Sequence, residues 1–282
     1  MSEMPTNPAS GPVAGNLSPM EAVRMGWRLL MSDFWAIALA GLVVAGILLA
    51  LRFVPCVSYC EPIIVPFLWP PLMAGLFLVI HRRIDGYPVD VGAVFDGFRQ
   101  RYWQSVVAAL PITLVFLVMG ALLIVVMMGA GMGVGMLMPQ RSQDMELAQV
   151  AVMYGAIFVA ILIEYVIVGV ISLFLMFAML IVWERPESGW EAAKASARLV
   201  TQHLGEAAVF GLIFAAIWLA ALFAGVLAMC VGLFFTMAVF QAWHAASVVY
   251  LYRSWTGRPL AVPEGPLAAP LPTTSIEPPS GL

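Results

Sequence analysis

Three cysteines are the first residues of this chain that could carry covalent or metal chemistry. Cys56 and Cys60 form a C-x3-C pair, and Cys230 stands much later. All three fall in short breaks between long apolar runs, on what the charge pattern below predicts to be the outer side of a membrane. A Cys56–Cys60 disulfide requires Cα atoms within about 7 Å of each other, in an oxidising compartment. The alternative is two unpaired thiols at the membrane boundary, and the spacing leaves both open.

Methionines gather on the same side of the predicted membrane: Met127, Met128, Met132, Met136 and Met138. Thioethers and thiolates together are ligands that suit Cu(I). The whole chain, however, contains 18 methionines, and the flexible thioether side chain commonly fills irregular gaps in apolar cores. We therefore interpret these residues as packing residues, and we predict neither a metal ion nor a cofactor.

Polar side chains inside apolar runs are candidates for function, because ionisable groups are expensive in hydrocarbon. Glu164 lies 19 residues before Trp183, about 28 Å along a helix, which places it near the outer interface. His244 lies about 15 Å from the inner end of the last apolar run, and Gln241 stands one turn away on the same face. Gln241 and His244 are therefore the candidate mid-membrane polar pair. The alternative, which we favour, is an interhelical hydrogen bond worth about 0.6 kcal/mol.

Sequence signatures of catalysis are missing from the chain. It contains no phosphate-binding P-loop, no nucleophile elbow and no H-E-x-x-H motif. Its basic residues are scattered over short segments between apolar runs. We therefore predict a non-enzymatic protein that does not bind nucleic acid.

The composition of the chain indicates that membrane-spanning helices position these residues. Of 282 residues, 62% are hydrophobic and 10% are charged, whereas soluble domains carry about 25% charged residues. A helix crosses the roughly 30 Å of hydrocarbon with about 20 apolar residues. We predict six crossings, within residues 34–53, 62–83, 103–128, 147–183, 206–228 and from 232 to 253. Residues 18–258 form the membrane domain, between disordered tails at 1–17 and 259–282.

The first crossing and its leading segment occur twice. Residues 18–46 and 188–216 share nine identical positions of 29, and both begin with S-x-x-E. This motif predicts a capping box at the start of a helix. A fainter third copy runs through residues 89–103. The chain is therefore predicted to be an all-α bundle of six transmembrane helices, built from three repeats of an interfacial amphipathic helix and a transmembrane hairpin, around a pseudo-threefold axis along the membrane normal.

The leading segment predicts an amphipathic helix. Its apolar positions Met20, Val23, Trp27 and Leu30 recur at helical spacing, and Glu21, Arg24 and Arg28 fall on the other side. In the second copy, Trp190, Ala193, Ala197 and Val200 oppose Glu191, Lys194 and Arg198. Such a helix can lie in the membrane interface with its basic edge towards anionic headgroups. The alternative is a surface helix packed on protein.

Basic residues fix the predicted orientation. The segments on the side of the termini contain eleven of the 13 basic residues, and the opposite side contains Arg52 and Arg141. Loops on the cytoplasmic side are enriched in Lys and Arg, so both termini are predicted to be cytoplasmic. Twelve of the 13 basic residues are Arg, a usage typical of GC-rich bacterial genomes. We predict a multi-pass protein of the bacterial inner membrane.

Short motifs along residues 18–258 resemble those of a diffuse group of bacterial membrane proteins. The motifs are Gly26-Trp27-Arg28-Leu29, the run from Val94 to Arg99, the A-x-x-A-S-x-R of Ala192–Arg198 and the exit Tyr250–Arg253. The group includes the YciC-like family and the membrane domain fused to some glycerophosphodiester phosphodiesterases. Val94 stands where the group's pattern would have leucine. The resemblance implies a polytopic membrane domain and no catalytic residues, because the phosphodiesterase domain is absent.

The paucity of polar residues within the spans decides the predicted function. We expect a scaffold or partner-binding subunit in the lipid bilayer, with a membrane-protein partner or a second copy of the chain. The alternative is a small transporter or permease-like protein with a path near Gln241 and His244. The scaffold interpretation predicts that these two side chains face protein rather than a water-filled cavity.

Overall fold

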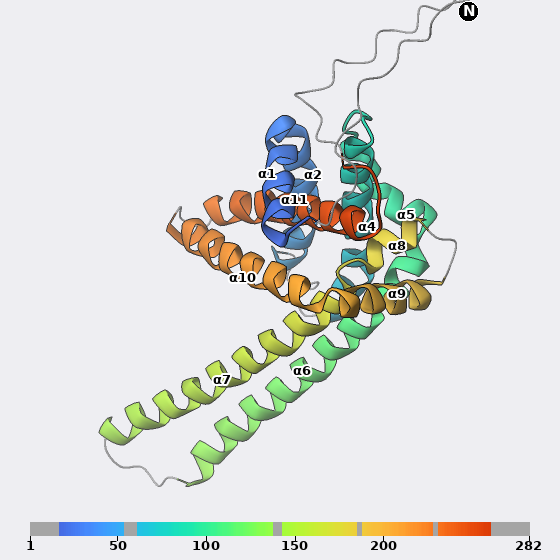
Figure 1. Cartoon of the computed structure of the whole chain (residues 1–282). Helices are drawn as coiled ribbons and strands as arrows, with labels where there is room; N and C mark the ends of the chain where they lie inside the picture. Colours follow the sequence, from blue (N-terminus) through green and yellow to red (C-terminus); the bar gives the residue numbers. More distant parts are fainter. Residues whose placement is uncertain (1–16, 54–60, 138–142, 185–187, 228–230, 261–282) are drawn as a thin grey trace, which may run out of the picture.

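The described part of the chain is built of helices alone. A computed structural model describes residues 17–53, 61–137, 143–184, 188–227 and 231–260. The elements, drawn in Figure 1, are α1 (Pro19–Ser32), α2 (Phe34–Phe53), α4 (Glu61–Ile84), η1 (Val91–Phe95), α5 (Asp96–Gln100), α6 (Tyr102–Leu137), α7 (Gln143–Leu175), α8 (Ala178–Glu184), α9 (Gly189–Gln202), α10 (Leu204–Leu227) and α11 (Val231–Trp255). Six candidate membrane spans lie in α2, α4, α6, α7 with α8, α10 and α11. Over these residues, the prediction of an all-helical chain with six helices long and apolar enough to span a membrane is confirmed.

The two amphipathic helices α1 and α9 begin alike. Each has 14 residues, and the preceding serine is extended, with φ −64° and ψ 152° at Ser18 and φ −66° and ψ 153° at Ser188. At Ser18 the predicted capping box is present: the hydroxyl accepts from the Glu21 amide, and the Glu21 carboxylate accepts from the Ser18 amide at 2.9 Å. These hydrogen bonds from Ser18 lower the pKa of Glu21.

The second capping box is only half formed, which corrects the prediction. The Ser188 hydroxyl accepts from the Glu191 amide at 3.3 Å, as at the first helix. The Glu191 carboxylate instead lies 2.5 Å from Lys194 Nζ, one turn further along the same helix. The first copy has Arg24 at the matching position, and there the glutamate bonds to the cap serine.

The faces of α1 differ from the predicted division. Its buried side is formed by Pro19, Ala22, Val23, Gly26, Leu29 and Leu30. Met20 and Trp27, predicted to share the face of Val23, are 48% and 41% exposed. They lie at the edge of the face because a helix turns 100° per residue, which places Met20 and Trp27 between Val23 on one side and Arg24 on the other. Helix α1 therefore presents a protein-facing side and an exposed side on which apolar and basic residues adjoin.

Helix α1 packs along α11 through a glycine. A Cβ on Gly26 would lie 2.2 Å from Ser247 Oγ, so only glycine permits this approach. The Trp243 indole donates to the Val23 carbonyl at 2.9 Å, and its ring lies 4.8 Å from that of Trp27. Small residues that let helices approach closely are typical of packing in lipid, where apolar burial alone gives no driving force.

The segment proposed as a third copy is shorter than the other two. It consists of the 3-10 helix η1 and the single turn α5, both packed on α4. Two glycines bring the backbones together: a Cβ on Gly75 would lie 1.8 Å from the Val94 carbonyl, and one on Gly97 would lie 1.9 Å from the Pro71 carbonyl. The amphipathic segment of this copy is thus two short turns rather than one 14-residue helix.

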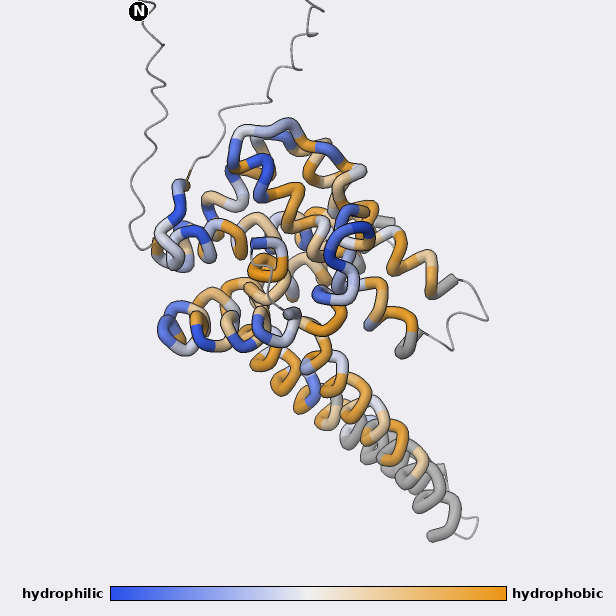
Figure 2. The backbone as a smooth tube through the Cα atoms, turned by 90° about the vertical axis from the view of Figure 1, so that its right-hand side faces the viewer, coloured by the Kyte–Doolittle hydropathy of each residue, from blue (hydrophilic) through white to orange (hydrophobic). Residues whose placement is uncertain are grey.

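Helices α6 and α7 project from the molecule as a long antiparallel pair (Figure 1). Apolar side chains such as Leu114, Val125 and Val166 are 50–66% exposed along them. Figure 2 shows this hairpin to be almost wholly apolar, with hydrophilic residues gathered on the opposite side of the molecule. The helical run towards Trp183 breaks at Met176 and Phe177, before α8. This break lies in the last third of the apolar run at residues 147–183.

Helices α4 and α11 end in the same way. The Tyr87 amide donates to the Arg82 carbonyl and the Gly86 amide to that of Arg83. The equivalent bonds at α11 run from Arg258 to Arg253 and from Gly257 to Ser254. Gly86 and Gly257 have φ of 89° and 70°, the left-handed conformation that ends a helix in a Schellman motif and favours glycine.

Candidate functional site

Several residues singled out in the sequence lie outside the part that the structure places. Cys56, Cys60 and Cys230 fall outside the described residues, so the disulfide stays a prediction. Of the methionine group, Met128 is an exposed residue of α6, and the side chains of the other four are not described. No group of three or more His, Cys, Asp and Glu side chains that could hold a metal ion was found among the described residues. Glu164 lies half-buried on α7. Among the described residues, no ion pair was found between Glu164 and His244.

His244 lies in an aromatic environment on α11. Its ring centroid is 4.7 Å from that of Phe214, 6.2 Å from that of Phe210 and 6.1 Å from that of Phe240. Two of these phenylalanines come from the neighbouring helix α10, so the hairpin partner supplies most of the surroundings. Within the described chain, the contacts found for the imidazole are these aromatic rings. Its ring nitrogens are therefore not committed to the interhelical hydrogen bond that we favoured.

Gln241 stands three residues before His244, on the same face of α11. Its amide nitrogen lies 2.9 Å from the sulfur of Met73 on α4. A thioether is a weak hydrogen-bond acceptor, so this contact satisfies the amide poorly. Gln241 thus forms a hydrogen bond between α11 and α4, as the interhelical-bond alternative predicted. A ligand with a stronger acceptor could replace the Met73 sulfur in this bond.

Both side chains border a cavity of about 420 Å³ inside the bundle. Its walls come from α4, α6, α7 with α8, α10 and α11, and every lining residue lies within a candidate span. Aromatic and methionine residues make up half of the lining residues. The lining includes Trp69, Phe77, Phe210, Phe214, Trp218 and Phe240 together with Met73, Met176, Met179 and Met237. Gln241 and His244 therefore border an internal, mostly apolar cavity. The sequence does not show this cavity, because it depends on where neighbouring helices separate.

The chemistry of this cavity is that of a binding site for apolar molecules. Among the described residues that line it there is no Asp, Glu, Lys or Arg, so the wall has no charged side chain to balance the charge of an ion. The hydrogen-bonding side chains are Ser172, Gln241 and His244, together with the indoles of Trp69 and Trp218. Ligand pockets typically combine a mostly apolar wall of roughly 300–1,000 Å³ with a few such polar groups.

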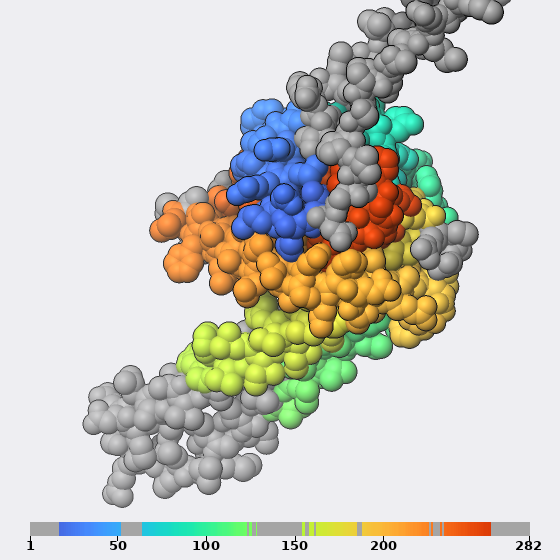
Figure 3. Space-filling model, in the orientation of Figure 1, coloured from blue at the N-terminus to red at the C-terminus, as the bar shows by residue number. Residues whose placement is uncertain are grey.

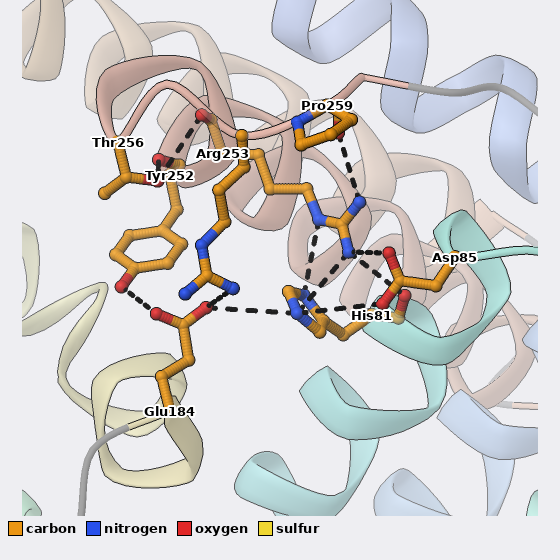
Figure 4. Close-up of polar contacts among 8 residues, drawn as sticks. His81, Asp85, Glu184, Tyr252, Arg253, Thr256 and Pro259 are labelled. Carbon is orange, nitrogen blue, oxygen red and sulfur yellow. Dashed lines mark hydrogen bonds and ion pairs between the residues drawn. The ribbon is translucent and has the colours of Figure 1, made fainter.

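A second group of polar residues joins three helix ends (Figure 4). Asp85 near the end of α4 forms an ion pair with Arg253 on α11, and the Arg253 Nε donates to His81 at 3.4 Å. Glu184, the last residue of α8, accepts from the Tyr252 hydroxyl and lies 2.6 Å from Arg258. We call His81, Asp85, Glu184, Tyr252, Arg253 and Arg258 the polar cluster.

The polar cluster holds the ends of α4, α8 and α11 together. The Arg253 side chain is 4% exposed, and a buried guanidinium is tolerated only when it is paired and hydrogen-bonded. The same guanidinium donates to the Pro259 carbonyl at 3.1 Å, which fixes the chain after α11. The acidic and basic groups of the polar cluster therefore pair with one another and hold the three helix ends together, and we call this arrangement a structural clamp.

Sequence reasoning missed the polar cluster, although one local signal was present. His81 and Asp85 are four residues apart on α4, a spacing that places both on one helical face. Glu184 and Arg253 stand far from them in the sequence. Their meeting depends on how three helix ends converge, which periodicity does not contain.

Comparison with family models, with curated proteins and with solved structures finds no match for this chain. The site is therefore interpreted from its own residues.

Proposed function

We propose that this chain is a non-enzymatic, multi-pass protein of the bacterial inner membrane that binds an apolar molecule of the lipid class. The observation that carries the proposal is the apolar cavity of about 420 Å³ that includes Gln241 and His244 in its wall. It favours the alternative of a permease-like protein with a path near these residues over a scaffold. A hydrophilic solute would need a polar route, so the ligand must be largely apolar.

The gap between α7 and α10 supports lateral access from the bilayer. The residue contacts between these helices are few, among them Gly211 with Leu173 and Tyr165 with Trp218. Gly169, which lines the cavity, is exposed on α7. In Figure 3 the surfaces of α7 and α10 separate towards the outer parts of the two hairpins. A lipid-like molecule can reach the cavity there without passing through water.

Contacts between different repeat units support the proposed three-unit architecture. The leading segment of each unit packs on the second hairpin helix of another unit: α1 on α11, η1 and α5 on α4, and α9 on α7 and α8. This cyclic order is what a pseudo-threefold arrangement requires. The matched ends of α4 and α11, and the matched starts of α1 and α9, support the same proposal.

The exposed side of α1 supports the proposed interfacial position. Met20, Trp27 and Met31 are 41–48% exposed beside Arg24 and Arg28. Apolar side chains next to basic ones suit the boundary between acyl chains and anionic headgroups. The cytoplasmic placement of this helix and of both termini rests on the distribution of basic residues.

The cavity can be tested by filling it. The chain is purified from native membranes in a mild detergent, and its bound molecules are extracted and identified by mass spectrometry. Ala109, which lines the cavity and is 2% exposed, is replaced in Ala109→Phe. The matched control is Leu212→Phe on α10, where the side chain is 74% exposed. We expect one apolar species to be retained by the wild type and the control and lost from Ala109→Phe. Identical extracts from all three proteins would refute the proposal.

A further inference from the structure

We propose, resting on the lipid-binding function above, that the cavity receives a flat, uncharged ring that carries hydrogen-bond-accepting oxygens. An isoprenoid quinone has this chemistry. The inference goes beyond a general lipid site because it assigns the polar residues of the cavity to one end of the ligand.

The cavity wall excludes a charged headgroup. None of its lining residues is Asp, Glu, Lys or Arg, whereas phosphate recognition requires Arg, Lys or a helix N-terminus. The wall lies entirely within the spans, where a phospholipid presents only its acyl chains. A ligand recognised by polar groups at this depth must therefore be neutral.

The polar groups of the wall favour an acceptor over a hydrocarbon chain. Neutral imidazole always carries one N–H donor, and the contacts found for His244 are with aromatic rings. Among the described residues, the acceptor found for the Gln241 amide is the Met73 sulfur, and a carbonyl oxygen is a stronger acceptor. Ser172 brings a hydroxyl from α7, another wall of the same cavity. An acyl chain would leave these donors unsatisfied, whereas ring carbonyls can accept from them.

The apolar part of the wall favours a ring. Phe210, Phe214 and Phe240 surround the imidazole with centroid distances of 4.7–6.2 Å. The faces of aromatic side chains offer flat, apolar surfaces against which a planar ring can pack. The methionine sulfurs of the wall also make favourable contacts with rings and adapt to their shape. The exposed edge at Gly169, between α7 and α10, leaves room for an apolar tail to extend into the bilayer.

The test compares two rings that carry the same decyl chain. One has hydrogen-bond-accepting carbonyl oxygens and the other has none. The full-length protein is reconstituted in phosphatidylcholine nanodiscs, and saturable binding of decylbenzoquinone and of decylbenzene is measured against protein-free nanodiscs. We expect the quinone to bind about tenfold more tightly, the equivalent of one neutral hydrogen bond. His244→Phe and Gln241→Met keep the shape of the wall and remove a donor. Each should weaken quinone binding severalfold and leave decylbenzene binding unchanged, and Leu212→Phe should change neither.

Each outcome decides one of the two claims. Equal, saturable binding of both probes would overturn the ring-acceptor inference and leave the lipid-binding function standing. Non-saturable binding of both probes would overturn both. If His244→Phe fails to fold, Gln241→Met and the comparison of the two probes on the wild type still test the ring-acceptor inference.

Discussion

The carboxylate of Asp33 lies 3.8 Å from the Nε of Arg83, a side chain that is entirely buried. Asp33 ends α1, and Arg83 lies in the last turn of α4. The amphipathic helix is thereby joined at its end to the second span of its own hairpin. The corresponding end of α9 is joined to α11 in a similar place, where the His203 ring stacks on Trp255 at 4.5 Å.

Asp33→Asn should destabilise the protein because it removes a counter-charge from a buried guanidinium. We expect a loss of about 1–3 kcal/mol in unfolding free energy, measured by denaturation in detergent. The matched control is Asp96→Asn. The Asp96 carboxylate lies 3.5 Å from Arg82 Nη1, and the Arg82 side chain is 42% exposed. An exposed pair of this kind is worth at most about 1 kcal/mol. Equal losses in the two variants would contradict the role given to Arg83.

Gly26→Ala should lower the stability of the protein, whereas Gly46→Ala should not. A Cβ at Gly26 collides with Ser247, while a Cβ at Gly46 has no atom within 4 Å. We expect the first variant to lose about 1–3 kcal/mol by overpacking and the second to be neutral or up to about 1 kcal/mol more stable. The same denaturation measurement reports both. A neutral Gly26→Ala would show that α1 does not pack closely on α11.

Tyr252→Phe and Glu184→Gln should be coupled, since the two side chains share a hydrogen bond between α11 and α8. A double-mutant cycle should give an interaction energy of about 0.5–3 kcal/mol. A parallel cycle of Tyr252→Phe with Glu191→Gln provides the control, because Glu191 pairs with Lys194 on α9. Additive losses in the first cycle would mean that the polar cluster does not clamp these helix ends.

Alkaline phosphatase fusions should report the orientation derived from the basic residues. The enzyme is active only outside the cytoplasm, so fusions after residues 60 and 142 should be active. Fusions after residues 90 and 190 should be inactive, because eleven basic residues mark that side as cytoplasmic. The reverse pattern of activity would invert the proposed topology.

Periodicity and apolar length predicted the helices well because these are local properties. The six spans follow from runs of about 20 apolar residues, and the start of α1 follows from the capping motif at Ser18. The exposure of Met20 and Trp27 could not be predicted, since it depends on where α11 packs. The cavity beside His244 and the clamp at Arg253 also depend on packing between distant helices. The positions of Gln241 and His244 could be predicted, but not what they face.

The most direct test of the account is photolabelling of the cavity from within the membrane. Native membranes are incubated with an apolar diazirine probe, irradiated and mapped by mass spectrometry in wild type, Ala109→Phe and Leu212→Phe. We predict saturable labelling at cavity residues such as Met73 and Met237, and loss of that labelling only in Ala109→Phe. Residues exposed on the outer surface of the helices, such as Phe223, should label in all three without saturation. Absence of labelling at the cavity residues, or labelling that Ala109→Phe leaves unchanged, would contradict a lipid-binding cavity.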